Sequence, residues 1–150
     1  MVSKFYSVNM DERQRLSEYV HLPVAVNVLQ GIANGVYQNN EILRLEAQLK
    51  SQVAGTAFYI ISRALILAES KGFINTDKIR EKPTKPLTDK DLVYIGELYA
   101  GHVNSEIREN RDWPLEEVYS CRRRVLKALE ASNEYQIVLW AAKRRKKEKQ

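Results

Sequence analysis

The hydrophobic pattern of residues 9–72 predicts a set of helices. Apolar residues recur there every three or four positions, which is the spacing of residues that share one face of a helix. A first helix is expected from Asn9, a good cap residue, to about His21. A second is expected to begin near Pro23, because proline is favoured in the first turn of a helix.

A third, longer helix is predicted from Asn39 or Asn40 to Gly72, since glycine suits the end of a helix. It carries two apolar stripes, the second of them from Val53 onward. One stripe is Ile42, Leu45, Leu49, Val53, Ala57, Ile60, Ala64 and Leu67, and the other is Ala54, Phe58, Ile61 and Leu65. A helix that is apolar on two faces is buried on both, either in its own bundle or against another subunit. Small residues at 54–57 would permit close helix approach.

Residues 1–74 are therefore interpreted as a helical module for dimerisation or partner binding, because about 70 residues make a thin core alone. The module ends at residues 75–86, a polar segment with two prolines, Pro83 and Pro86. This segment separates two regions of apolar periodicity and is interpreted as a linker.

Downstream of the linker the pattern predicts four short helices with clear caps. Thr88 and Asp91 have the spacing of a capping box, and Leu87 and Leu92 lie at the apolar positions that flank such a cap. The helix that they begin is expected to stop at Gly101.

Asn104 is expected to cap the second of these helices, and Pro114 suits the first turn of the third, over residues 115–131. The inward stripe of the third helix is expected to be Leu115, Val118, Val125, Leu126 and Leu129. Asn133 is the expected cap of a last helix, which carries Ile137, Val138 and Trp140. A helix, a glycine turn, a short helix, a second turn and a longer helix are typical of a helix-turn-helix domain. The predicted fold is all-α, with such a domain at residues 87–142.

The net charge of +5 is located at one end of the chain. Residues 143–150 hold six Lys or Arg residues and one Glu, which leaves 18 basic and 18 acidic residues in residues 1–142. Such a basic tail is either a solvated, frayed helix end or a non-specific contact to phosphates.

Compartment and membrane association follow from two further features. Cys121 is the only cysteine, so no internal disulfide can form, as is usual in a reducing compartment. The uncharged run from Ser51 to Ser62 has only 12 residues, too few to cross a bilayer, and no signal peptide is visible. The expected location is the cytoplasm, without a membrane contact.

The stretch "LTDKDLVYIGELYAGHVNSEIRENRDWPLEEVYSCRRRVLKALEASN" resembles the LuxR/FixJ/NarL-type helix-turn-helix domain. The residues at the family's positions, without a gap, are Leu87, Thr88, Lys90, Asp91, Leu98, Gly101, Asn104, Glu106, Ile107, Val118, Val125, Leu126, Leu129 and Asn133. The resemblance covers just over a third of the chain. The sequence departs from the pattern at Arg108, at Glu117 and at the turn, where residues 111–114 replace the usual L-G-I-S. Trp113 stands where the family has a core isoleucine.

The resemblance implies that double-stranded DNA is read by the outward face of the third helix, at Tyr119, Ser120 and Arg123, with Lys127 one turn further on. Helical geometry agrees, because these residues lie opposite the inward stripe. Glu116 lies on the same side and would repel phosphates.

The three consecutive arginines are expected to have separate roles, because neighbouring residues of a helix point about 100° apart. Arg122 lies towards the buried flank, where its stem would pack on the domain and its guanidinium pair with an acid. Arg123 is the candidate for a guanine edge. Arg124, at the side of the helix, is a candidate phosphate contact.

Further phosphate contacts are expected outside this helix. The backbone N–H of Ser105, at the start of the second helix, is one candidate. The others are the tail residues Lys143, Arg144 and Arg145.

The sequence predicts a DNA-binding transcriptional regulator that acts as a homodimer, as a hetero-oligomer with another regulator, or with RNA polymerase. The alternative is a protein-interaction module of the same fold, in which only the tail touches nucleic acid. No enzyme, cofactor or metal is predicted. His21, His102 and Cys121 lack zinc-ligand spacing, and no glycine-rich phosphate loop is present.

Overall fold

A computed structural model describes residues 12–51 and 53–148, and all the regular structure in this part of the chain is helical. The predicted cap Asn9 lies outside the described residues. The first helix covers residues 12–20. The helices that follow are α2 (Pro23–Ala33), α3 (Asn39–Lys50), α4 (Ala57–Ser70), α5 (Asp89–Tyr99), α6 (Asn104–Arg111), α7 (Leu115–Leu129) and α8 (Glu134–Glu148). The prediction of an all-α protein is confirmed for these residues.

The long helix predicted from residue 39 to Gly72 is wrong, because two helices, α3 and α4, occupy that range. Helix α3 ends at Lys50, and the turn that follows contains Gly55, whose φ of +140° is a value that other residues rarely adopt. Thr56 then caps α4, since its Oγ1 accepts a hydrogen bond from the N–H of Tyr59 at 3.1 Å. The small residues at 54–57 thus form most of a turn and the start of α4, and not a surface for close helix approach.

The second apolar face of α4 is covered within the same chain. Helix α4 packs against α2, α3 and α8, and Ile60, Ile61, Ala64 and Leu65 are fully buried. The two-faced pattern that suggested a second subunit is therefore explained by α8.

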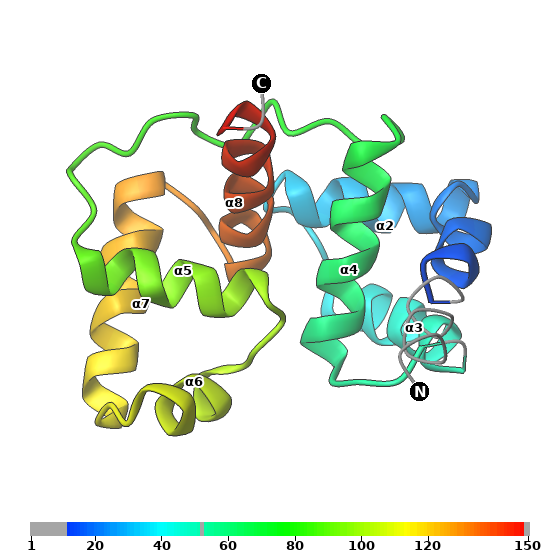
Figure 1. The fold of residues 1–150 in the computed structure, drawn as a ribbon. Coiled ribbons are helices and arrows are strands. Elements are labelled where there is room, and N and C mark those ends of the chain that lie inside the picture. Colours follow the sequence, from blue (N-terminus) through cyan, green and yellow to red (C-terminus); the bar gives the residue numbers. More distant parts are fainter. Residues whose placement is uncertain (1–11, 52, 149–150) are drawn as a thin grey trace.

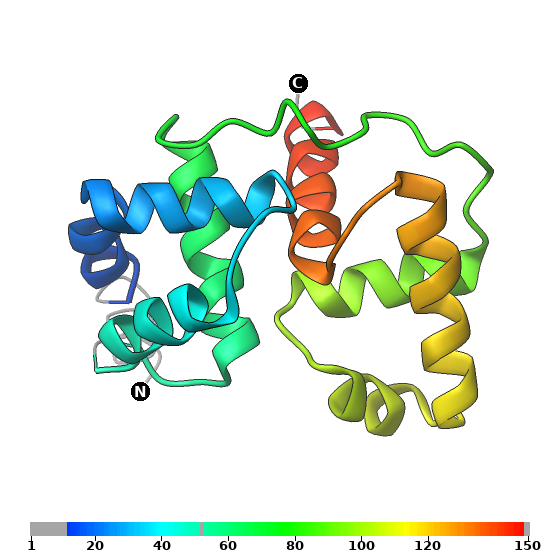
Figure 2. The ribbon, with the colours of Figure 1, turned by 180° about the vertical axis from the view of Figure 1, so that it is seen from behind.

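Helix α8 lies between the two halves of the molecule (Figures 1 and 2). It contacts α2 and α4 on one side and α5 and α7 on the other. Seven consecutive residues, 136–142, are buried, so this stretch has no exposed face. Gln136 joins α8 to the end of α2, because its amide donates to the carbonyl of Ala33 at 2.9 Å. The buried apolar residues of both halves form one continuous core.

Residues 75–86 cross the end of the molecule where α8 finishes, and several contacts hold this segment in place (Figure 1). Ile79 is buried, and the indole N–H of Trp140 donates to the carbonyl of Glu81 at 3.0 Å. The N–H of Thr84 donates to the carbonyl of Ala128 at 2.7 Å. The predicted linker is thus packed against both α7 and α8, and it does not act as a free tether.

Candidate nucleic-acid interface

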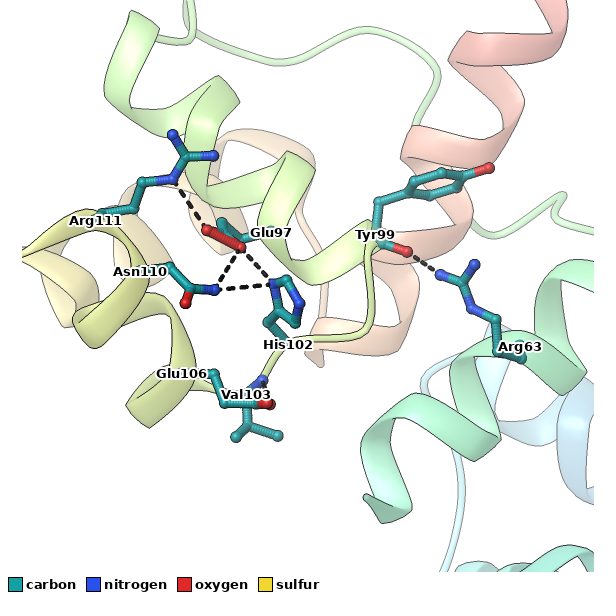
Figure 3. Close-up of polar contacts among 8 residues, drawn as sticks. All are labelled: Arg63, Glu97, Tyr99, His102, Val103, Glu106, Asn110 and Arg111. Carbon is teal, nitrogen blue, oxygen red and sulfur yellow. Dashed lines mark hydrogen bonds and ion pairs between the residues drawn. The ribbon is translucent and has the colours of Figure 1, made fainter. Parts of the chain in front are cut away.

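Helix α5 begins at the capping box expected from the sequence. The Thr88 hydroxyl accepts from the N–H of Asp91 at 3.1 Å, and the Asp91 carboxylate accepts from the N–H of Thr88 at 3.1 Å. Asn133 likewise caps α8, accepting from the N–H of Gln136 at 2.9 Å. The cap expected at Asn104 is wrong, because Asn104 is the first residue of α6. The N–H of the preceding Val103 is bound instead by Glu106, at 3.0 Å (Figure 3).

A buried carboxylate, that of Glu97, joins α5 to α6 (Figure 3). Only 5% of Glu97 is exposed. The Nε of Arg111 donates to Oε1 at 3.0 Å, and Nδ1 of His102 lies 2.5 Å from Oε2. The Nδ2 of Asn110 is 3.5 Å from the same oxygen. Burial on its own would raise the pKa of Glu97, but hydrogen bonds from His102, Arg111 and Asn110 outweigh it and hold the pKa below its ordinary value.

Arg111 stands where the resembled family has a core leucine, and its ion pair with Glu97 explains how a charged residue is accommodated there. The arginine keeps its guanidinium partly exposed while its Nε satisfies a buried acid. This contact joins α5 to α6 by a polar interaction, at a position where the resembled family has an apolar side chain.

The turn between α6 and α7 is formed by Asp112, Trp113 and Pro114. Asp112 adopts a left-handed conformation, with φ 55° and ψ 42°, which closes α6. The Trp113 side chain packs on the edge of the core, and the ammonium of Lys90 lies 5.7 Å from its ring centroid. Trp113 thus fills part of the space expected for a core side chain at this position.

Helix α7 has one buried face and one exposed face. Val118, Cys121 and Val125 are fully buried, while Leu129 is 2% exposed. The inward position expected for Leu115 is wrong, since this residue in the first turn is 40% exposed. Cys121 is an additional buried residue of α7 that the stripe did not include. Burial raises the pKa of its thiol to about 11, which keeps it protonated and a poor nucleophile.

The four residues expected to read DNA lie on the exposed side of α7. Tyr119, Arg123 and Lys127 are exposed, and Ser120 is half-buried. Arg123 reaches back along the helix to donate to the Ser120 hydroxyl at 3.2 Å. Arg123 and Lys127 form no ion pair with another described residue. The structure thus groups these four side chains on one face, over about two turns of helix.

The other two arginines of the triplet are held by acids of neighbouring helices. Arg122 pairs with Glu134 of α8, as expected for a residue that supports the domain. Arg124 pairs with Asp91 at 3.0 Å, although it was expected to contact a phosphate. Because Asp91 is buried and belongs to the capping box of α5, Arg124 has a structural role between α5 and α7.

A hollow of about 550 Å³ lies between α6 and the start of α7, and it adds one residue to the candidate surface. Ser105 lines it together with Arg108, whose exposed guanidinium has no ion pair among the described residues. The sequence analysis treated Arg108 only as a departure from the family pattern. The signal that could have identified it is its position in the short helix next to the turn.

The candidate tail contacts lie at the far end of the molecule from α6 and the first turns of α7 (Figures 1 and 2). The described part of the tail continues α8 as a helix. Arg145 stacks on the Tyr99 ring at 4.2 Å, and Arg144 pairs with Glu148 at 3.3 Å. Lys143, at the inner edge of the tail, is half-buried. The structure therefore does not bring Lys143, Arg144 or Arg145 together with Tyr119 and Ser120.

The charges around α6 and α7 are mixed. Arg108, Arg123 and Lys127 are basic, and exposed Glu109, Asp112 and Glu116 are acidic. A surface of this kind attracts phosphates only weakly through its overall charge.

No protein-family profile, curated protein or solved structure matches the chain. The described helices include none that is both long enough and apolar enough to span a membrane. Among the same residues, no three His, Cys, Asp or Glu side chains group in a way that would hold a metal ion.

Proposed function

We propose that the chain is a DNA-binding protein that reads the major groove with α7, as a helix-turn-helix of α6 and α7. One observation carries the proposal: α7 exposes Tyr119, Ser120, Arg123 and Lys127 on a single face next to a short helix, with Arg108 beside the turn. A helix presented in this way fits the major groove, and an arginine can bind guanine through two hydrogen bonds.

A single α7 would contact only a few base pairs, so the proposal includes a second binding unit. A second copy of the chain, or another regulator, would place its own recognition helix about 34 Å away along the duplex. Exposed apolar side chains in the first half of the chain, Val24, Val36 and Leu43, support such a contact.

The test is selection of a preferred sequence from random duplex DNA, followed by affinity measurements on the selected site. We expect Arg123→Ala to weaken binding by about 1–3 kcal/mol, with relaxed preference at one base pair. The matched control is Arg44→Ala, which removes an exposed arginine from α3 on the other half of the molecule. Equal affinity of the Arg123 variant and the wild type at fixed salt would exclude α7 as the reading helix.

The salt dependence of the same complex measures how many phosphates are neutralised. Three cations of this surface have no ion pair among the described residues, namely Arg108, Arg123 and Lys127. If each neutralises one phosphate, the slope of log K against log salt concentration should be about −3 per protomer. Replacing Lys143 and Arg144 by glutamine should leave the sequence preference unchanged.

The second candidate is a protein-interaction module, and the observation that favours it is the pairing of the tail. Lys146 pairs with Glu69 at 2.7 Å and Lys147 with Glu81, so much of the charge excess is used within the molecule. This function would be supported if no DNA sequence were enriched and if weak binding disappeared when the tail lysines were neutralised.

A further inference from the structure

A half-open cavity of about 400 Å³ lies where three segments meet, namely the start of α5, the last turns of α8 and residues 80–83. Its floor is mostly apolar and includes Pro83, Leu87, Leu92 and Trp140. Leu92 is 37% exposed, an unusual exposure for a leucine beside a core. This volume is enough for one bulky side chain and parts of the residues next to it. It is at the lower end of the volumes of small-molecule binding sites.

The side chains of these four floor residues contain one polar atom, and it is already paired. The indole N–H of Trp140, the polar atom of its side chain, is donated to the carbonyl of Glu81 at 3.0 Å. Trp140 is 5% exposed, and the guanidinium of Arg144 lies 5.4 Å from the centroid of its ring. The side chains of the floor therefore give a small polar molecule no partner, and a nucleic-acid base would find no open aromatic face on which to stack.

The rim of the cavity is basic. Arg80, Lys82, Lys143, Arg144 and Lys147 line it, against a single acid, Glu81. Arg80 pairs with Glu130 at 3.6 Å, and Lys147 pairs with Glu81. Lys82 and Lys143 have no ion pair among the described residues. Two lysines are therefore available to carboxylates on either side of an apolar hollow.

We propose that this cavity is the docking site for an acidic segment of another protein, which inserts one bulky apolar side chain between Leu87 and Leu92 and places carboxylates beside Lys82 and Lys143. The charge complementarity comes from the rim, and the affinity comes from covering the apolar floor. The site lies at the other end of the molecule from α6 and the first turns of α7 (Figure 1), while Arg80 of its rim pairs with Glu130, just after the last turn of α7 that carries Lys127.

The experiment uses the full chain as bait for a phage-displayed library of random 12-residue peptides. We expect the enriched peptides to combine Asp or Glu with one Leu, Phe or Trp. The best peptide, made synthetically, should shift the amide resonances of Leu87, Leu92 and Lys143 in a nitrogen-15 NMR spectrum.

Two variants test the two parts of the site. Reversing the charge of Lys82 and Lys143 together, Lys82→Glu with Lys143→Glu, should weaken peptide binding by about tenfold or more. Leu92→Ser should weaken it to a similar degree by removing the apolar floor. The matched control, Arg44→Glu with Lys50→Glu on α3, changes charge equally and should leave affinity unaltered. Thermal unfolding of each variant shows whether it is folded.

Three results would overturn the proposal. One is a selection that enriches no peptide, or enriches only peptides without Asp or Glu. Enriched peptides that bind the wild type and the Lys82→Glu, Lys143→Glu variant equally well would count in the same way. Another is binding of random 20-base-pair DNA at this site, with an affinity that falls on charge reversal and is unchanged by Leu92→Ser. That result would indicate a phosphate site. The third is a homodimer that dissociates on charge reversal, which would make a second copy the occupant.

Discussion

Two glycines, Gly96 inside α5 and Gly101 just after it, differ in whether a larger residue could replace them. Gly101 ends the turn after α5 with φ +95°, and a Cβ there would lie 2.4 Å from Cδ2 of Tyr59. Gly96 lies inside α5, where a Cβ would meet no atom within 4 Å. Position 101 requires glycine because of its backbone conformation and the lack of space for a side chain. At position 96 glycine has no such role, and it only weakens the helix.

We therefore expect Gly101→Ala to lower the free energy of unfolding by about 1–3 kcal/mol, because both strain and a clash oppose it. Gly96→Ala should raise it by about 0.5–1 kcal/mol through helix propensity. Urea denaturation monitored by circular dichroism measures both. Equal effects of the two substitutions would contradict the conformational assignment of Gly101.

Glu97 is the residue on which the α5–α6 contact depends. We expect Glu97→Gln to lower the free energy of unfolding by about 2 kcal/mol at pH 7, because charge-assisted hydrogen bonds from Arg111 and His102 are lost. Glu109→Gln, on the exposed side of α6, serves as the control and should change little.

The pH dependence of that difference follows from the lowered pKa of Glu97. A carboxyl whose pKa is lower when folded contributes its stability fully above the ordinary value of 4.5 and loses it as the pH falls through the folded value. The part of the gap between wild type and Glu97→Gln that comes from the Glu97 carboxyl should thus be fully present well above pH 4.5 and shrink as the pH falls below about 4.5. A gap that persisted at pH 3 would show that Glu97 acts by shape alone.

At the scale of elements, the junction of α6 and α7 combines a tight turn with part of the surface proposed to bind DNA. Asp112 closes α6 in the left-handed region at φ 55°, where glycine is favoured, and forms no hydrogen bond through its side chain among the described residues. The carboxylate also lies beside the hollow that contains Arg108.

Asp112→Gly should therefore stabilise the protein by about 0.5–1 kcal/mol, measured as the shift in the denaturation midpoint. Asp112→Asn, which keeps a residue tolerant of this conformation, should leave stability nearly unchanged. If α6 and α7 bind DNA, both variants should also bind the selected site more tightly at low salt, since a negative charge has been removed. Lower stability of the glycine variant would contradict the turn geometry.

At the scale of the whole molecule, α8 makes the two halves one folding unit. It contacts α2 and α4 on one side and α5 and α7 on the other, and its centre is buried on all sides. A change in its buried stretch is transmitted to both halves, because neither has a core separate from this helix.

Ile137→Ala, at a fully buried position of α8, should lower the free energy of unfolding by about 2–4 kcal/mol through lost burial and a cavity. Hydrogen exchange should speed up by the same factor in α4 and in α5, with a single denaturation transition. Val24→Ala, at a position 70% exposed, should have little effect. Faster exchange in only one half would show that the halves unfold independently.

Local features of the chain were readable from the sequence. The caps at Thr88 and Asn133, the turn at Gly101 and the exposed face of α7 all depend on residues within a few positions of one another. These features arise from hydrogen bonds between a side chain and the adjacent backbone and from the 3.6-residue period of a helix. Both depend on residues that are close in sequence, so they can be predicted from the sequence directly. The end of α3 at Lys50 was missed because a continuing apolar stripe masked the cap at Thr56.

The tertiary structure alone decided which distant groups meet. Arg111 pairs with Glu97 and Arg124 with Asp91 because α5 packs beside α6 and α7, and no spacing along the chain shows which acid an arginine will reach. The sequence predicted a last helix at the position of α8, but only the packing shows that this helix joins two halves and completes the surface of α4. By itself, the sequence determined most of the helices and most of their local faces, since those depend on near neighbours. The partners of those faces depended on how the helices pack.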